Sequence, residues 1–237
     1  MKTAKDIAER LQISVSTVGR ALANDPRISV LTKQRVAAAA AELGYVANRA
    51  AQMMRGVSSN LVGLVVPDIR NRFYSTTAHA LSKCMQTGGF QLMLSETDDD
   101  RTVELQHLRE LSSANVAGVI IVPTAKPLPE SVRLLSALPH IQLLRRIPAL
   151  GDQWFAIDDA NALFQATQHV LELGHERIAY IGGSTELPTG AARIRGFRAA
   201  LEGTRAAAQA REELGAPSAS DVGRNAVRRL LSLSEPP

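Results

Sequence analysis

The sequence predicts a small all-α head followed by a larger α/β body, and three observations support this fold class. The first 60 residues carry two short helical patterns separated by a tight turn. From Leu61 onward, apolar runs of strand length alternate with helical stretches, which favours a parallel sheet with helices on both faces. Residues 1–60 also hold nine basic residues against four acids, whereas the whole chain carries a net charge of only +4. A basic head on a near-neutral body indicates a polyanionic partner for the head alone.

The head opens with two helix-start signals. Thr3 followed by Asp6 is a hydroxyl cap with an acid in the first turn. Ser14 can cap a second helix, whose buried stripe would be Val18, Ala21 and Leu22. The turn between the two helices is too short for antiparallel packing over much length, so we expect the steep crossing of a helix-turn-helix.

A third helix is expected from about Val30 to Leu43, with Ser29 as its cap and Gly44 in a left-handed conformation at its end. Its apolar residues can close a small core with the first two helices. The expected core is Ile7, Leu11, Ile13, Val18, Leu22, Val36, Ala40 and Leu43, with Tyr45 and Val46 at its edge.

The body shows a regular alternation of strands and helices. Strands are expected at Leu61–Val66, Phe90–Ser95, Val116–Val122, Ile141–Leu144, Phe155–Ile157 and Arg177–Ile181. Helices are expected at Tyr74–Gln86, Arg101–Ser112, Pro129–Ala137, Asn161–Leu173 and Ala191–Glu202. Ligands of doubly wound sheets bind beyond the carboxyl ends of the strands. The loops that begin at Pro67, Ser95, Pro123, Asp158 and Gly182 are therefore the candidates for a ligand site.

Several classes of protein are disfavoured by what the sequence lacks. The single cysteine, Cys84, excludes an internal disulfide and fits a reducing cytosol. The first residues do not form a secretory signal and no apolar run reaches membrane-spanning length, so we expect a cytoplasmic protein without a membrane partner. The five histidines show no metal-ligand spacing, and Gly182-Gly183-Ser184 matches neither a phosphate loop nor a nucleophile elbow. We expect no enzymatic activity, no metal and no cofactor.

Specific stretches of the chain resemble the lactose/purine repressor family of bacterial transcription regulators. The head stretches are Asp6-Ile7-Ala8, Ser14-Val15-Ser16-Thr17-Val18, Glu42-Leu43-Gly44-Tyr45 and Asn48-Arg49. The body stretches are Val62–Ile69, Leu173-Gly174-His175, Arg177–Gly183, Arg193 and Gly196-Phe197. The resemblance runs from residue 3 to about residue 202.

This resemblance implies a domain order and a function. Residues 1–46 would form the DNA-binding head, residues 47–60 a hinge helix and linker, and residues 61–237 a two-lobed body like periplasmic sugar-binding proteins, its second lobe starting near residue 158. Family members bind palindromic double-stranded DNA operators as dimers and switch on a small effector, often a sugar or nucleobase. We therefore expect a homodimeric repressor controlled by a sugar, sugar acid or nucleobase, with the helix Tyr74–Gln86 at the subunit interface.

The second helix carries the expected base-reading residues. A recognition helix enters the major groove with its N-terminal residues nearest the base edges. There Val15 can contact a thymine methyl group, Ser16 can hydrogen-bond several bases, and Arg20 can bind guanine O6 and N7. By resemblance, the same three positions read bases in the family.

Three hydroxyl residues are expected at DNA phosphates: Ser14, Thr17 and Ser29. All lie near helix N-termini, where hydroxyls and backbone N–H groups suit phosphate oxygens. The alternative is that Ser14 and Ser29 merely cap helices, which they do in either case. For Thr17 the structural and phosphate-binding roles stay equally open.

The stretch after the head is expected to enter the minor groove. Asn48 can cap a short helix from Arg49 to Arg55, which is too short to be stable alone and would form on docking. By resemblance, Asn48, Arg49 and Met54 form the minor-groove hinge. Met54 stands where the family has a leucine that wedges between base pairs and kinks the duplex. The alternative is that Met53 and Met54 pack together between subunits; we favour the wedge for Met54 and packing for Met53.

The effector residues are assigned by resemblance. Asp68, Asn71 and Phe73 would face the cleft on the loop after the first strand, and Arg193 matches an arginine that holds effector oxygens. A solvated helix arginine is the alternative for Arg193, since Arg195 and Arg198 lie nearby. Arg145 stands where many family members have aspartate, and its positive charge would suit an acidic effector such as a sugar acid or a phosphorylated sugar.

The resemblance thins after Leu201. The segment Glu202–Glu213 favours a helix by composition, and a further helix is expected at Asn225–Leu231. We expect a truncated family member whose head and first lobe fold, whose second lobe is incomplete, and whose effector binding is weak or absent. The alternative function is therefore that of an effector-blind DNA-binding protein of the same family.

Overall fold

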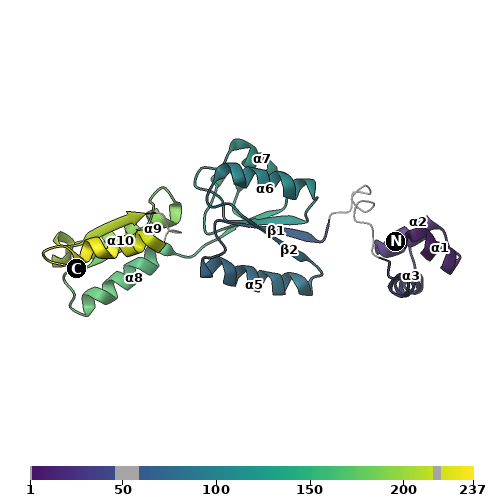
Figure 1. Cartoon of the computed structure of the whole chain (residues 1–237), viewed down its shortest axis with the longest axis horizontal. Coiled ribbons are helices and arrows are strands. Elements are labelled where there is room, and N and C mark those ends of the chain that lie inside the picture. The colour runs from purple at the N-terminus through teal and green to yellow at the C-terminus, as the bar shows by residue number, and fades with distance from the viewer. Residues whose placement is uncertain (1, 46–58, 216–219) are drawn as a thin grey trace. The chain divides into compact units, whose positions relative to one another are not determined.

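The computed structural model describes residues 2–45, 59–215 and 220–237. The chain forms two compact units, residues 1–59 and residues 60–237 (Figure 1). Val46 and the expected hinge residues Asn48, Arg49 and Met54 lie outside the described residues, so the roles expected for them stay predictions.

The first unit is a three-helix head with α1 at Ala4–Leu11, α2 at Val15–Leu22 and α3 at Val30–Glu42. The predicted helix starts are confirmed. The Asp6 carboxylate accepts both the N–H and the hydroxyl of Thr3, each at 2.7 Å. Ser14 and Ser29 each accept a backbone N–H from the residue three positions on, at 3.0 and 3.2 Å. Gly44 has a φ of +61°, which is the predicted left-handed end of α3.

The core of the head is the one that the sequence predicts. Ile7, Val18 and Val36 are fully buried where the three helices meet. Alanines fill much of the remaining contact and let these short helices approach closely. The other members of the cluster are Ala8, Ala21, Ala39 and Ala40, with Ala4, Leu11, Ile13, Leu22, Ile28, Leu43 and Tyr45 packed partly buried around them.

The second unit begins with a lobe built on a five-stranded parallel sheet of order β2-β1-β3-β4-β5. Its strands are β1 (Leu61–Val66), β2 (Gln91–Glu96), β3 (Gly118–Ile121), β4 (His140–Leu143) and β5 (Trp154–Phe155). Its helices are α5 (Arg72–Thr87), α6 (Arg101–Ser113) and α7 (Pro129–Ser136), with a short 3-10 turn at Pro148–Leu150.

Helices cover both faces of this sheet (Figure 1). On one face, α5 packs Tyr74, Ala78 and Leu81 against alternate residues of β1. On the other face, α6 and α7 bury Leu108, Leu111 and Leu135 against the sheet. Because β1 is covered on both sides, its sequence is a continuous apolar run.

The second lobe contains a parallel pair of strands, β6 (Ala179–Gly183) and β7 (Arg211–Gly215). Its helices are α8 (Asp159–Glu172), α9 (Pro188–Leu201) and α10 (Ser220–Leu231). Tyr180 of β6 stacks on Phe197 of α9 with ring centroids 5.3 Å apart. A Cβ at Gly196 would meet the carbonyl oxygen of Ala160 at 2.0 Å, so only glycine allows α8 and α9 to pack this closely.

The predicted helix across Glu202–Glu213 is wrong. That segment forms a 3-10 turn at Arg205–Ala208 and then the strand β7, which pairs in register with β6. Backbone pairing with β6 and side-chain pairing outweigh local helix propensity. The Glu212 carboxylate binds Arg198 of α9 at 2.6 Å, and the Glu213 carboxylate binds Arg229 of α10 at 2.6 Å.

Five of the six strand predictions are placed correctly but with shifted ends. Those at Phe90–Ser95 and Ile141–Leu144 correspond to β2 and β4, each displaced by one residue. The strand predicted at Val116–Val122 is shorter and is β3, and the one predicted at Phe155–Ile157 is β5, which ends at Phe155. The one predicted at Arg177–Ile181 is β6, which starts two residues later. None of the helices formed by the described residues combines the length and apolar character of a membrane span.

Candidate functional site

The outward face of α2 presents the three predicted base-reading side chains. Val15 is 49 % exposed, and Ser16 and Arg20 are also exposed. The opposite face of the same helix buries Val18 and Ala21 in the core of the head. The outward face of α2 is therefore an exposed ridge, with one apolar and one hydroxyl group in its first turn and one guanidinium group in its last turn.

The predicted phosphate hydroxyls are engaged at helix starts. Ser14 Oγ lies 2.8 Å from the hydroxyls of both Ser16 and Thr17, besides accepting the Thr17 N–H. Ser29 Oγ lies 2.8 Å from the hydroxyl of Thr32. The capping role of Ser14 and Ser29 is therefore confirmed, while contact of Ser14, Thr17 and Ser29 with phosphate stays a prediction.

The acids of the described head are all paired with neighbouring bases: Asp6 with Lys2, Glu9 with Lys5, Asp25 with Arg27 and Glu42 with Arg10. Hydrogen bonds from Arg27 lower the pKa of Asp25 to about 2. Within residues 2–45, three cations form no ion pair: Arg20, Lys33 and Arg35. Lys33 donates a hydrogen bond to the Asn24 carbonyl at 3.2 Å. The excess positive charge of the head is thus carried by cations that remain available to a partner.

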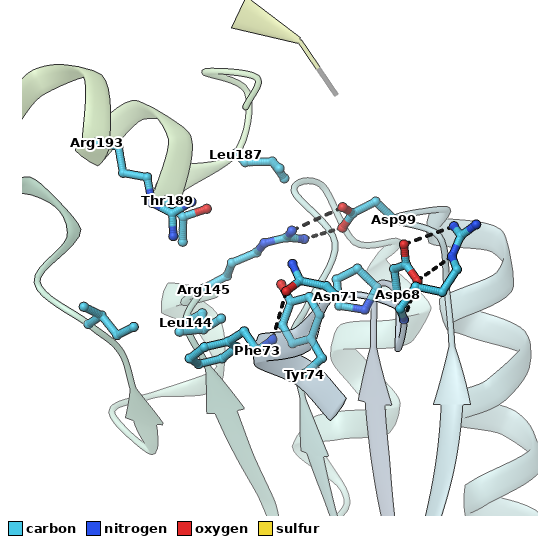
Figure 2. Close-up of a pocket in the computed structure, with 13 residues that line it drawn as sticks. Asp68, Asn71, Phe73, Tyr74, Asp99, Leu144, Arg145, Leu187, Thr189 and Arg193 are labelled. Atoms are coloured by element: carbon cyan, nitrogen blue, oxygen red, sulfur yellow. Dashed lines mark hydrogen bonds and ion pairs between the residues drawn. The ribbon is translucent and has the colours of Figure 1, made fainter. Parts of the chain in front are cut away.

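A cavity of about 660 Å³ lies beyond the carboxyl ends of the strands in the second unit (Figure 2). All five residues predicted for the effector site line it: Asp68, Asn71, Phe73, Arg145 and Arg193. Their lining position is an observation, and their contact with an effector stays a prediction. Sequence reasoning missed other lining residues, among them Tyr74, Asp99, Leu187 and Thr189.

The start of α5 fixes the aromatic wall of this pocket. Asn71 Oδ1 accepts the N–H of Phe73 at 3.0 Å and so caps the helix. Phe73 is 43 % exposed and meets Tyr74 edge to face, with ring centroids 5.7 Å apart. Burial raises the pKa of Tyr74, so its hydroxyl stays protonated at neutral pH and can donate to a ligand.

Three acid–base pairs balance the charges of the pocket. Asp68 binds Arg70 through two contacts at 2.9 and 3.0 Å, and these bonds lower the pKa of Asp68. Arg145 binds the Asp99 carboxylate, and Arg193 Nε donates to Asp159 Oδ1 at 2.7 Å. Within the described ranges, no group of three His, Cys, Asp or Glu side chains is placed to hold a metal ion.

Family models match both units of the chain. Residues 59–237 match the model of periplasmic binding proteins and the sugar-binding domain of the LacI family. Residues 3–48 match the model of bacterial regulatory proteins of the lacI family. This chain belongs to the LacI family. The predicted fold class, a helical head with an α/β body on parallel strands, is thereby confirmed.

Individual relatives of this LacI-family chain agree with the match. It is 33 % identical to the transcriptional regulator DegA of Bacillus subtilis over 84 % of this chain and 60 % of DegA. A LacI-family regulator from Silicibacter pomeroyi superposes with a TM-score of 0.74 at 25 % identity, over 98 % of this chain and 70 % of that chain. The Cra regulator of Pseudomonas putida, solved with fructose 1-phosphate, superposes with a TM-score of 0.66 at 26 % identity. The match covers 73 % of this chain and 64 % of the Cra chain. The chain thus spans about 60 % of the length of DegA.

Proposed function

We propose that this LacI-family chain is a cytoplasmic transcription regulator, acting as a repressor, that binds a palindromic DNA operator as a homodimer. The observation that carries the proposal is the exposed ridge of α2. Val15, Ser16 and Arg20 point outward from a helix whose other face is locked into the core. A helix presented in this way can enter the major groove with its first residues at the base edges.

The charge of the head supports a DNA partner. Its acids are paired within the head, and Arg20, Lys33 and Arg35 form no ion pair among residues 2–45. Cations of this kind release counterions from DNA when they reach phosphates. Ser14, Thr17 and Ser29 add hydroxyls near helix N-termini, and Asn48, Arg49 and Met54 would follow in the minor groove at the operator centre.

Two heads are needed for a useful operator. One recognition helix reads only a few base pairs, so specificity over a genome requires two half-sites and two subunits. We assign α5 to the subunit interface. It leaves none of its residues fully buried within the subunit, although its inner face packs on the sheet.

The pocket of the body is proposed to bind the effector, a small molecule of the sugar class. Five side chains converge on one cavity from the loop after β1, the first turn of α5, the loop after β4 and the helix α9: Asp68, Asn71, Phe73, Arg145 and Arg193. Polar side chains beside exposed aromatic rings suit a polyhydroxylated ligand, because hydroxyls take the hydrogen bonds and a ring packs on the C–H faces. A related regulator, Cra of Pseudomonas putida, was solved with a sugar phosphate. No enzymatic step forms part of the proposal.

The decisive experiment is selection of bound DNA from a random pool by the purified chain. A near-palindrome with two half-sites is expected, with binding that weakens steeply as salt rises. Failure to enrich any sequence at low salt would overturn the proposal. Calorimetric titration with sugars, sugar acids and nucleobases then separates an effector-controlled regulator from an effector-blind one. A ligand of the former must also release or strengthen operator binding.

A further inference from the structure

Asp99 and Arg145 form an ion pair that lines the pocket (Figure 2). Arg145 is only 5 % exposed, whereas the Asp99 side chain is 31 % exposed. Two guanidinium nitrogens bind the two Asp99 oxygens, one of them at 3.2 Å, and Arg145 Nη1 also donates to the Pro123 carbonyl at 3.0 Å. The pair therefore ties together the loops that follow β2, β3 and β4.

Backbone strain accompanies both partners of the pair. Asp98 and Asp99 have φ of 48° and 59°, and Leu144, directly before Arg145, has a φ of 60°. A left-handed leucine is costly because its Cβ crowds the backbone. The loop before Asp99 is held in place by hydrogen bonds from Thr97 N–H to Val66 and from Asp98 N–H to Pro67, at 3.0 and 2.9 Å. This left-handed backbone brings the Asp99 carboxylate into contact with the Arg145 guanidinium group.

The pairing changes what Arg145 can offer to a ligand. A free arginine would attract an anion, and this is the reason that the sequence alone favours an acidic effector. Asp99 balances that charge and accepts hydrogen bonds from Nη1 and Nη2 of Arg145. A phosphate would need these N–H groups for a bidentate contact. Of the five N–H donors of a guanidinium, three are directed at Asp99 and Pro123, which leaves others for neutral hydroxyls.

The other two arginines that line the pocket are also paired with aspartates. Arg70 is paired with Asp68, and Arg193 with Asp159. An anion entering the pocket would therefore meet no cation that lacks an acidic partner among the described lining residues. It would also meet the partly exposed carboxylate of Asp99 and be repelled by it.

We propose that Asp99 is a specificity-determining residue, which masks the charge of Arg145 so that the pocket accepts an uncharged polyhydroxylated ligand and rejects a phosphorylated one. This inference rests on the proposed role of the pocket as the effector site. It names the ligand class of that site and a residue that sequence reasoning missed.

The test is a calorimetric titration of the full chain and its variants, with inorganic phosphate as the probe. Asp99→Asn removes the masking charge with little change in shape. Phosphate should bind this variant at least about tenfold more tightly than the parent, a gain of roughly 1.4 kcal/mol. The gain should vanish in the double variant Asp99→Asn with Arg145→Gln, because the unmasked cation is then gone.

Matched variants separate this mechanism from a general charge effect. Asp152→Asn releases Arg146 from an ion pair at a residue that does not line this cavity, and it should leave phosphate binding unchanged. The exchanged pair, Asp99→Arg with Arg145→Asp, keeps one acid and one base. Its affinity for phosphate should therefore match that of the parent. If Asp99→Asn does not fold, Asp99→Ser provides the same comparison.

The proposal is overturned by any of three outcomes. The parent could bind phosphate as tightly as Asp99→Asn, a folded Asp99→Asn could show no gain, or Asp152→Asn could show an equal gain. None of these depends on DNA, so they are distinct from failure of the proposed function, which would appear as a chain that selects no operator.

Discussion

The head and the pocket both carry arginines on their proposed binding faces, but the charge of those arginines is paired in the pocket and, within residues 2–45, unpaired on the face of α2. In the head, Arg20 stands on an exposed helix face without an ion pair in residues 2–45, while the acids nearby are paired elsewhere. In the pocket, Arg70, Arg145 and Arg193 each bind a carboxylate. An available cation suits a polyanion, and a paired one suits a neutral ligand that needs directional hydrogen bonds.

The same contrast holds for the acids. Asp25 of the head is hydrogen-bonded by Arg27, and its pKa falls to about 2. Glu104 of the first lobe is buried on α6, and burial raises its pKa. The head thus keeps Asp25 ionised and neutralised by a neighbouring base, whereas the body keeps a carboxyl group out of water. The two units should therefore respond differently to mutation, pH and salt.

The largest expected effect comes from the core of the head. Ile7 is fully buried among three short helices, and Ile7→Ala should cost roughly 2–5 kcal/mol of head stability. A domain with so small a core is only marginally stable. The head should therefore unfold in this variant, and DNA binding should be lost. Anisotropy of labelled operator DNA measures this loss.

The body should not respond to Ile7→Ala, because the chain forms two separate compact units. The only tryptophan, Trp154, lies on β5 and therefore reports on the body and not on the head. Its emission and its unfolding midpoint in urea should match those of the parent. A lowered Trp154 midpoint would show that the two units unfold together.

The second effect concerns base reading by the head. Arg20→Ala should weaken operator binding by roughly 1–3 kcal/mol per half-site and relax one base position. Arg10→Ala is the matched control, since Arg10 carries the same charge but is paired with Glu42. Affinities for operators substituted at single positions provide the measurement. Equal weakening on all sequences would leave Arg20 as a phosphate contact and not a base reader.

Much of this fold could be predicted because local signals and the tertiary structure agree. The caps at Thr3, Ser14 and Ser29 start helices as expected, and the apolar spacing correctly identifies the core of the head. The failure lies at Glu202–Glu213, where composition favours a helix. The end of this segment instead forms a strand that pairs with β6, which lies well before it in the sequence. Pairing between distant segments is not visible in local propensity.

The pocket could be predicted only in part. Five of its lining residues follow from resemblance to family positions, and the loops follow from the rule for parallel sheets. Asp99 was missed, because its partner Arg145 lies 46 positions away and the contact depends on left-handed backbone at Asp98 and Asp99. Without that partner, Arg145 suggests an acidic effector. The ion pair removes the basis of that suggestion.

A third effect tests the contrast between the two kinds of acid. Glu104 is fully buried on α6 and accepts the Thr124 N–H at 2.7 Å. Because burial raises its folded-state pKa above the ordinary value of 4.5, the stability it contributes is present below that value and is lost as pH rises through the folded pKa. For every tenfold change in the proton affinity of this carboxyl group on folding, the stability changes by about 1.4 kcal/mol. Glu104→Gln should remove this decline, as measured by Trp154 fluorescence in urea from pH 4.5 upward.

The control for this variant lies further along the same helix. Glu110 is exposed, and hydrogen bonds led by that from Gln106 lower its pKa. Its contribution has the opposite sign: it is present above the unfolded pKa and lost as pH falls. Glu110→Gln should therefore leave the decline above pH 4.5 intact. A pH profile of Glu104→Gln that coincides with that of the parent would contradict the assignment.

The smallest effect, a change in salt dependence, separates available cations from paired ones within the head itself. Lys33 is held near the turn after α2 by its bond to Asn24 and has no acidic partner in residues 2–45. Lys5 lies 3.8 Å from Glu9, and both side chains are well exposed. If Lys33 contacts a phosphate, Lys33→Gln should lower the slope of log affinity against log salt by about 1 per subunit, with little change in sequence preference. Lys5→Gln removes the same charge and should leave the slope unchanged, because Lys5 is occupied by Glu9. Equal slopes for Lys33→Gln and the parent would place Lys33 away from the DNA, and a reduced slope for Lys5→Gln would show that net charge alone, not pairing, governs the head.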